Sequence, residues 1–262
     1  MPRSLKFFYF GYQCPHSAYL LARIKTIAWK EGAALQLYDI SEDPRVCEEY
    51  DIFSPNMLIV NDRYRWQGPF TKEDVIAMVN DEEPTPRLSE TKMGTEIVAG
   101  SLVPITPSSV LSTCEPCLQS DDTGMCRGKA EWVESLLRET GADCLGYLHM
   151  LDGKCVGGAE FLPSRSVPYP IPDKRDTNAF LTCSYLSDSE YDYRSHPLDA
   201  LITDLMRLGY DTLSVVSSDR LAFPNGPSNW FVSKGFVDRK KLASERLPES
   251  ELHYLQLSIG PA

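Results

Sequence analysis

The chain is predicted to be an α/β protein of two domains, and three observations support this. Its 262 residues exceed the usual size of one domain. Short apolar runs typical of buried strands alternate with segments of helical spacing along the chain. Between them, residues 81–87 combine acidic side chains with two prolines. We therefore expect a first domain over residues 1–82, a linker over 83–94 and a second domain over 95–262.

The composition narrows the classes of partner and the compartment. The 26 basic and 37 acidic residues give a net charge of −11, which argues against nucleic acid and against an anionic membrane surface. The sequence contains neither a long apolar run nor a signal-peptide pattern. We therefore expect a cytoplasmic protein, with a homodimer possible. The eight cysteines are then expected to be reduced, metal-bound or redox-active rather than paired in structural disulfides.

The first domain is predicted to alternate strands and helices. The expected order is a strand over 5–10, a helix over 18–30, a strand over 35–40, a helix over 44–50 and a strand over 57–60. Cys14 lies just before the first of these helices, where exposed amides and the helix dipole stabilise a thiolate. Its pKa is therefore expected to lie below about 7.5, and Cys14 is a candidate catalytic thiol.

This order of elements, with a proline before the third strand, resembles the thioredoxin fold. The run Cys14-Pro15-His16-Ser17 matches the Cys-x-x-Cys motif of that family, with Ser17 in the place of the second cysteine. The resemblance implies a cis proline facing the cysteine, and Pro55 is the matching position. A single thiol cannot release its own mixed disulfide. Monothiol chemistry, cluster or glutathione binding, and a scaffold without chemistry all remain open.

A second group of cysteines lies early in the second domain. Cys114 and Cys117 form a Cys-x-x-Cys motif, and Cys126 follows nine residues later. Thiolates at this spacing suit zinc or an iron–sulfur cluster. A fourth ligand at a diagnostic spacing is not apparent in the sequence. Packing of reduced thiols as small hydrophobic groups is therefore the alternative to a metal site.

The rest of the second domain is predicted as a mixed α/β unit. The expected elements are a strand and turn over 95–106, a helix over 129–139, strands over 144–150, 154–162, 180–186 and 212–216, a helix from 198 to about 208, and a short helix before Gly235. Asp152 and Gly153 predict a tight turn between the strands over 144–150 and 154–162. Gly209 is expected to end the long helix in the left-handed conformation.

The run of strand, acidic loop, helix, strand and the closing Trp-Phe-Val-Ser-Lys-Gly-Phe of residues 230–236 resembles the core of GNAT-type N-acetyltransferases. The resemblance covers roughly residues 95–262 and implies a mixed-sheet acyltransferase domain. It also implies that acetyl-CoA lies in a V between two central strands, and that its acyl group passes to a small-molecule or protein amine. The residues matched to the cofactor are Cys183, Ser184, Tyr185, Leu186, Arg194, Ser195 and Asn229.

The sequence departs from that family at two places. Family members hold the pyrophosphate on a glycine-containing loop, whose backbone amides can approach the anion. This chain has no glycine between Gly158 and Gly209. Its loop instead carries three acidic residues, which oppose coenzyme A: Asp188, Glu190 and Asp192. Phe231 stands where many members have the tyrosine that protonates the leaving thiolate, and phenylalanine has no proton to donate.

Five residues are candidates for the chemistry of the second domain. Glu160 is the best-placed carboxylate to take the proton of an amine, with a solvent-facing strand residue as the alternative. Tyr191, Tyr193 and His196 are candidates to protonate the leaving group. Cys183 is either a nucleophile or a packing residue. Two functions follow: an N-acetyltransferase, or a cofactor-free binding protein of the same fold or monothiol redox protein acting through Cys14.

Overall fold

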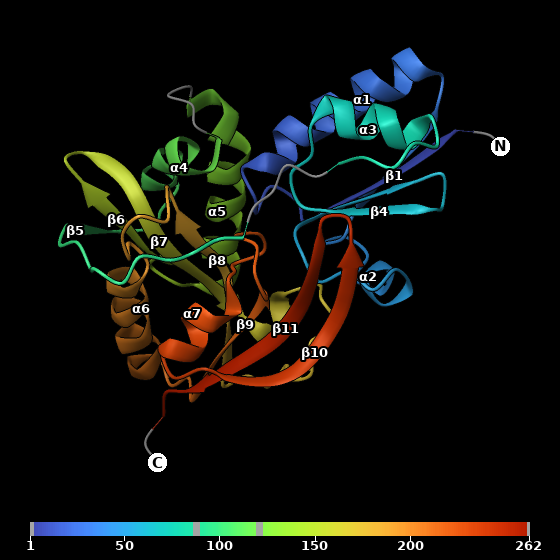
Figure 1. Ribbon diagram of the computed structural model, residues 1–262. Helices are drawn as coiled ribbons and strands as arrows, with labels where there is room; N and C mark the ends of the chain where they lie inside the picture. The colour runs from blue at the N-terminus through green and yellow to red at the C-terminus, as the bar shows by residue number, and fades with distance from the viewer. Residues whose placement is uncertain (1–2, 86–89, 119–122, 261–262) are drawn as a thin grey trace.

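The computed structural model describes residues 3–85, 90–118 and 123–260 and contains two β-sheets (Figure 1). A four-stranded sheet belongs to the first part of the chain, residues 3–82, with strand order β2-β1-β3-β4. A seven-stranded sheet belongs to the second part, residues 95–260, with order β10-β11-β9-β8-β7-β6-β5. None of the described helices is long and apolar enough to cross a membrane.

The first part alternates strands and helices as predicted. Its elements are β1 (Ser4–Tyr9), α1 (His16–Glu31), β2 (Ala34–Asp39), α2 (Arg45–Glu49), β3 (Asn56–Val60), β4 (Tyr64–Gln67) and α3 (Lys72–Val79). β1 pairs parallel with β2 and antiparallel with β3. β4 and α3 were not predicted from the sequence, although Thr71 and Asp74 form a capping box at the start of α3.

The peptide bond before Pro55 is trans. The resemblance to thioredoxins implied a cis bond at this position, and that expectation is wrong. The cis peptides of the described chain lie instead before Pro224, Pro227 and Pro248, all in the second part.

The second part forms the mixed sheet expected from its sequence. Its elements are β5 (Ser101–Pro104), η1 (Ser109–Thr113), α4 (Cys114–Leu118), η2 (Thr123–Cys126), α5 (Arg127–Thr140), β6 (Gly146–Leu151), β7 (Lys154–Pro163), η3 (Ser164–Ser166), β8 (Asn178–Leu186), α6 (Ser195–Arg207), β9 (Thr212–Ser218), α7 (Ser228–Ser233), β10 (Val237–Arg246) and β11 (Glu249–Ser258). The turn at Asp152 and Gly153 is formed with both residues at positive φ, and Gly209 has a φ of 88° after α6. The final hairpin of β10 and β11 was not predicted.

The two central strands of this sheet part from each other. β8 and β9 are parallel, and they pair only where Asn178–Phe180 lies beside Thr212–Ser214. Beyond that point β8 continues to pair with β7, and β9 with β11. A gap shaped like a V therefore opens between the ends of β8 and β9.

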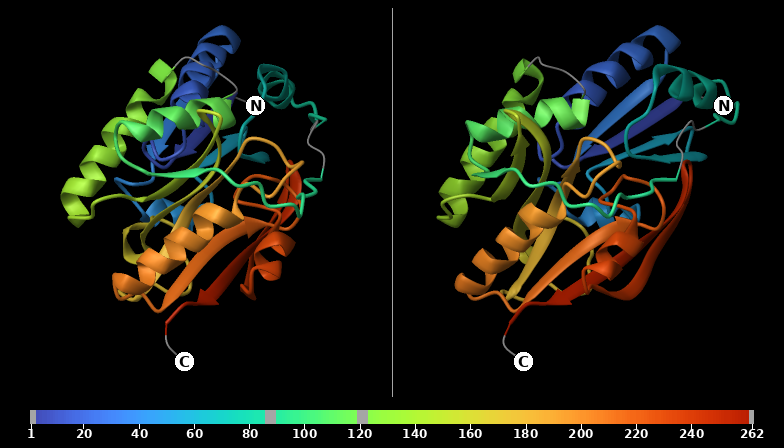
Figure 2. Two further views of the ribbon diagram at one scale, coloured as in Figure 1. Left: turned by 90° about the vertical axis from the view of Figure 1, so that its left-hand side faces the viewer. Right: turned by 60° about the vertical axis from the view of Figure 1, so that its left-hand side comes forward.

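The linker lies against the loop that precedes α6. The backbone N–H of Gly94 donates to the carbonyl of Ser189 at 2.8 Å, and that of Asp192 donates to Glu96 at 2.8 Å. Figure 2 shows this segment crossing the molecule from the first part to β5. We predicted a strand and turn over 95–106, but β5 begins only at Ser101. The backbone of Gly94 and Glu96 bonds to the loop before α6 instead of to a neighbouring strand.

One hydrophobic core spans both parts of the chain. On the first sheet, Leu5 and Phe7 face α1 and α3, whereas Phe8 and Phe10 face the opposite way, as alternation along a strand requires. Phe8 and Phe10 share a cluster with residues of the second sheet that include Leu148, Phe180, Tyr185, Val216 and Leu252. α6 and α7 cover the other face of that sheet. The division into two domains remains a prediction, while the shared core joins the two parts.

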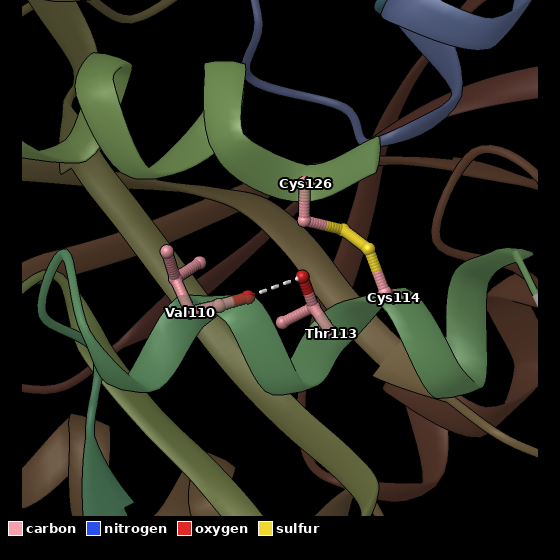
Figure 3. Close-up of a disulfide and its surroundings, with 4 residues drawn as sticks. All are labelled: Val110, Thr113, Cys114 and Cys126. Carbon is pink, nitrogen blue, oxygen red and sulfur yellow. Dashed lines mark hydrogen bonds between the residues drawn. A yellow bond between two sulfur atoms is a disulfide. The ribbon is translucent and has the colours of Figure 1, made fainter. Parts of the chain in front are cut away.

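Cys114 and Cys126 form a disulfide, with their Cα atoms 5.8 Å apart (Figure 3). The expectation of cysteines without structural disulfides is therefore wrong for these two residues, and neither zinc or cluster binding nor packing as reduced thiols describes them. The bond joins the first residue of α4 to the residue that precedes α5. Beside it, the Thr113 hydroxyl donates to the carbonyl of Val110 at 2.7 Å. Cys117 stays a free, half-buried thiol.

We predict that Phe10→Ala lowers the free energy of unfolding by about 3–5 kcal/mol, because it leaves a cavity in the shared core. The Phe10 ring lies 5.9 Å from those of Trp132 and Tyr169, both in the second part. Denaturant titration measures the loss. Trp29→Ala is the control, because this ring is 81% exposed and its removal should cost about 0.5 kcal/mol or less. Equal losses for the two variants would contradict the shared core.

Candidate functional site

Glu160 lies at the centre of a buried polar network between the two sheets. Its side chain, on β7, and that of Lys129, on α5, are both buried, and Lys129 Nζ lies 2.7 Å from Glu160 Oε2. The lysine also donates to the backbone carbonyl of Gln13, which follows β1 in the first part. The alternative interpretation of Glu160 as a solvent-facing residue is therefore wrong.

Three neutral groups complete the contacts of this carboxylate. Gln13 Nε2 donates to Oε1 at 2.9 Å, and the Thr182 hydroxyl donates to the same oxygen at 2.8 Å. The Tyr185 hydroxyl donates to Oε2 at 2.5 Å. Burial works to raise the pKa of Glu160, but the charge of Lys129 and the hydrogen bonds from Lys129, Tyr185 and Gln13 bring that pKa below its usual value. Glu160 is therefore a carboxylate whose charge is balanced by Lys129.

Cys14 lies beside this network, just before α1. Its sulfur is 3.5 Å from Nδ1 of His16, and the His16 ring also hydrogen-bonds the backbone of Cys117. Burial raises the pKa of the Cys14 thiol, and the backbone bond from His16 and the charge of Lys129 offset only part of this effect. The expected lowering is therefore wrong, because desolvation outweighs the field of the helix end.

Two other thiols lie close to the same network. Cys183 stands on β8 directly opposite Glu160, and burial raises its pKa. Burial also raises the pKa of Cys117 well above the usual value. Each thiol is thus held in its protonated form at neutral pH. Among the residues that the structure describes, no cluster of histidine, cysteine or carboxylate side chains could hold a metal ion.

The V between β8 and β9 contains the side chain of Asn225. The backbone N–H of Ser184 on β8 donates to Asn225 Oδ1 at 2.9 Å. Asn225 Nδ2 donates to the carbonyl of Val216 on β9 at 3.3 Å. One carboxamide therefore bridges the two strands at the place where they no longer pair with each other.

Arg194 lies against the same segment and is almost fully buried. Its Nε donates to the Ser184 hydroxyl at 2.6 Å, and its other nitrogens donate to the carbonyls of Asn225 at 2.7 Å and Gly226 at 2.8 Å. Its guanidinium also lies 4.3 Å from the centroid of the Trp230 ring. Burial lowers the pKa of Arg194 to about 10. The residue expected to meet a pyrophosphate is thus occupied by the chain itself.

Asp192 stabilises the start of α6 and does not project as a free charge. One of its oxygens accepts from the backbone N–H of Ser195 at 3.0 Å, and the other accepts from the Ser195 hydroxyl at 2.5 Å. Lys234 Nζ lies 3.0 Å from the same carboxylate. Burial works to raise the pKa of Asp192, but these bonds and the lysine lower it overall. The repulsion expected from Asp192 is therefore compensated by Lys234.

Two histidines and a tyrosine meet near the first turn of α6. His149, on β6, donates through Nδ1 to the carbonyl of Tyr193 at 3.0 Å. The ring of His149 lies 6.0 Å from the ring of Tyr193 and 5.4 Å from that of His196. The Nε2 atom of His149 is buried and has no hydrogen-bond partner in the described structure. The structure thus brings the candidates Tyr193 and His196 together, and adds His149.

Leu186 and Asn229 are the remaining candidates, and they lie in different places. Leu186 ends β8 and is half-buried, beside Gly157. Asn229 is exposed on α7, where it lines a cavity of about 240 Å³ with Trp230, Lys234 and residues 93–95. This cavity contains both Asp192 and Lys234, so its charges compensate each other.

Four residues of these networks were not predicted from the sequence: Gln13, Lys129, His149 and Asn225. In the sequence, Asn225-Gly226 between two prolines indicates a turn. Lys129, three residues before Trp132, places a charged side chain on the same side of a helix as an apolar one. Neither reveals which strand or carboxylate the side chain meets, because the partners lie far away along the chain.

No protein-family model matches this sequence, and no curated protein matches it. Solved structures similar to this chain include several acetyltransferases, which cover 60–63% of it. An N-acetyltransferase from Staphylococcus aureus Mu50 is 13% identical, covers 62% of this chain and 99% of its own, and has a TM-score of 0.45.

Two further structures are similar to a comparable degree. A putative acetyltransferase from Salmonella typhimurium, solved with its cofactor acetyl-CoA, is 13% identical, covers 63% of this chain and 96% of its own, and has a TM-score of 0.46. The ribosomal-protein-alanine N-acetyltransferase from Brucella melitensis is 15% identical, covers 60% and 99%, and has a TM-score of 0.42. With TM-scores below 0.5, what this chain does has to be inferred from its own geometry.

We predict that Lys129→Met destabilises the protein by about 3–5 kcal/mol, because it leaves the buried Glu160 carboxylate without its counter-charge. Adding Glu160→Gln should recover part of the loss, because a neutral amide is less costly to bury than a lone charge. Denaturant titration of both variants checks this expectation. A double variant less stable than Lys129→Met would contradict the charge balance.

We also predict that Cys14 in the folded protein reacts with iodoacetamide at a rate that still rises above pH 9. Burial holds the pKa of this thiol above its usual value, so the reactive thiolate is scarce at neutral pH. Peptide mass spectrometry after timed labelling measures the rate, and the unfolded chain in denaturant is the reference. A labelling rate that levels off near pH 7 would contradict the assignment.

Proposed function

We propose that the second part of the chain transfers an acyl group from acyl-coenzyme A to an amine. The parting of β8 and β9 carries this proposal. The two strands pair over three residues on each side and then diverge, which leaves backbone groups of both strands without a strand partner inside the sheet. GNAT-type acetyltransferases, which this part of the sequence resembles, bind the pantetheine arm in such a V.

The backbone of β8 offers the group that would orient the acyl donor. The N–H of Ser184 points across the V, because it donates to Asn225 there. Aimed at the carbonyl oxygen of an amide or thioester, the same N–H would hold the donor and polarise its carbonyl. Cys183 and Leu186, on either side of this stretch, would then line the path of the pantetheine arm.

The reaction needs two proton transfers. The amine nitrogen forms a bond to the thioester carbon, the carbon–sulfur bond breaks, and the thiolate leaves with the electron pair of that bond. A base takes the proton of the amine, and an acid gives one to the thiolate. We assign the acid to His196, because its imidazole is half-buried at the start of α6 and has His149 at its side. Phe231 is buried and cannot serve.

Glu160 is assigned to positioning in this scheme. Its two oxygens are fully engaged with Lys129, Tyr185, Gln13 and Thr182, and Tyr185 lies on β8 next to Ser184. The carboxylate therefore fixes the strand that would hold the acyl donor. The net charge of −11 favours cationic amines as acceptors.

Monothiol chemistry at Cys14 is the second candidate, and the contact between Cys14 and His16 supports it. A neutral imidazole at 3.5 Å can accept the thiol proton when a substrate arrives. Burial lowers the pKa of His16 to about 4, so the ring is neutral at physiological pH. The strand order β2-β1-β3-β4 fits a thioredoxin-like unit. The raised pKa of Cys14 makes this candidate the weaker one.

Acyl transfer is tested by release of free coenzyme A from acetyl-CoA in the presence of polyamines, aminoglycosides and lysine-containing peptides. We expect release that depends on the amine and falls about tenfold or more in His196→Gln, which removes the proton donor. His253→Gln is the matched control, because this histidine lies on β11 and pairs with Asp238. Its activity should equal that of the native protein. No release with any amine would overturn the proposal.

A further inference from the structure

We propose that Asn225 occupies the place of an amide of the acyl donor, and that the segment of residues 219–227 must withdraw before acyl-coenzyme A enters the V. This inference rests on the proposed function and adds a residue that controls access to its site. The segment joins β9 to α7 and folds back into the V between β8 and β9.

The carboxamide of Asn225 makes the bonds that a bound amide would make. It accepts from Ser184 N–H on one strand and donates to the Val216 carbonyl on the other, at 2.9 and 3.3 Å. Pantetheine contains two amide groups, and each offers the same pair of a carbonyl acceptor and an N–H donor. The chain therefore satisfies internally the backbone groups that the parted strands leave free, as buried polar groups require.

The rest of the segment is anchored around this side chain. Ser218 N–H donates to the Pro224 carbonyl at 3.0 Å, and the Ser217 hydroxyl donates to the Asn225 carbonyl at 3.4 Å. From the other side, Phe223 packs against Gly68 of the first part, where a Cβ would lie 2.6 Å from the phenyl ring. The closed segment is thus held by β9 and by the first part together.

Arg194 couples withdrawal of the segment to the arrival of an anion. In the described structure its guanidinium contacts two carbonyls of the segment, the Ser184 hydroxyl, Met93 and two aromatic rings, with no carboxylate bonded to it. Removing the segment takes away the two carbonyls and leaves a buried cation short of acceptors, which is costly. A phosphate group of coenzyme A supplies acceptors of the opposite charge. The open state is therefore stabilised by the ligand that needs it.

The backbone of the segment allows the closed state to be weakened at two neighbouring positions. Asn225 has a φ of 51°, which glycine adopts without strain. Asn225→Gly therefore removes the bridging carboxamide while the turn remains allowed. A Cβ at Gly226 would lie 1.9 Å from the Leu221 carbonyl oxygen. Gly226→Ala therefore disfavours the closed segment through its backbone and leaves the Asn225 side chain in place.

The affinity for coenzyme A, measured by calorimetry, tests the inference. If closure competes with the ligand, the apparent dissociation constant equals the intrinsic one divided by the fraction of open protein. Loss of two hydrogen bonds should then tighten binding by about tenfold in Asn225→Gly, and Gly226→Ala should act in the same direction. Asn61→Gly is the matched control, because Asn61 has a φ of 53° in the turn after β3. It should bind as the native protein does.

Hydrogen exchange of the native protein gives a second readout. Saturating coenzyme A should speed exchange in residues 219–227, while Ser184 N–H stays protected by its new partner. Equal affinities in all four proteins, with unchanged exchange of the segment, would overturn this inference and leave the proposed function standing. Absence of binding in every protein, with no acyl transfer, would overturn both. Tighter binding in the two segment variants alone supports both.

Discussion

The ion pair between Glu160 and Lys129 is the interaction on which the arrangement of the two parts depends. Neither charge reaches water, so each is tolerated only because the other is there. The backbone of Gln13 accepts from the lysine, and its side chain donates to the carboxylate. The pair is therefore complete only when the loop after β1 is docked on the second part. Apolar contact brings the two sheets together, and this polar centre limits how they can be oriented.

The same principle applies in the V between β8 and β9. A buried Arg194 is balanced by carbonyl oxygens and aromatic rings, and backbone groups without strand partners are satisfied by an asparagine. Parted strands and a buried cation are each unfavourable alone, and residues 225 and 226 supply hydrogen-bond partners to both. The segment of residues 219–227 thus lets parted strands and a buried cation coexist in a stable fold.

Sequence patterns predicted most of the secondary structure, because periodicity and turn chemistry act over a few residues. Residues 180–186 were predicted as a buried strand, and they lie in the central β8. Glu160, by contrast, is bonded by Lys129 of α5 and by Gln13 of the loop after β1. Its burial could not be predicted from the residues next to it in the sequence. The pKa of Cys14 was misjudged for the same reason, since the helix end is local and desolvation is tertiary. The disulfide between Cys114 and Cys126 could not be predicted either, because it depends on how α4 and the start of α5 pack together.

The position of the disulfide has a consequence for how the environment acts on this protein. Cys126 immediately precedes α5, and Lys129 is the third residue of that helix. The covalent link to Cys114 therefore anchors the end of the helix that supplies the buried cation. A cross-link that closes a short loop limits the freedom of the unfolded chain and so favours the folded one. Reduction of this bond would thus free the end of the helix that carries Lys129 and lower the stability of the fold, through two sulfur atoms that lie outside the V.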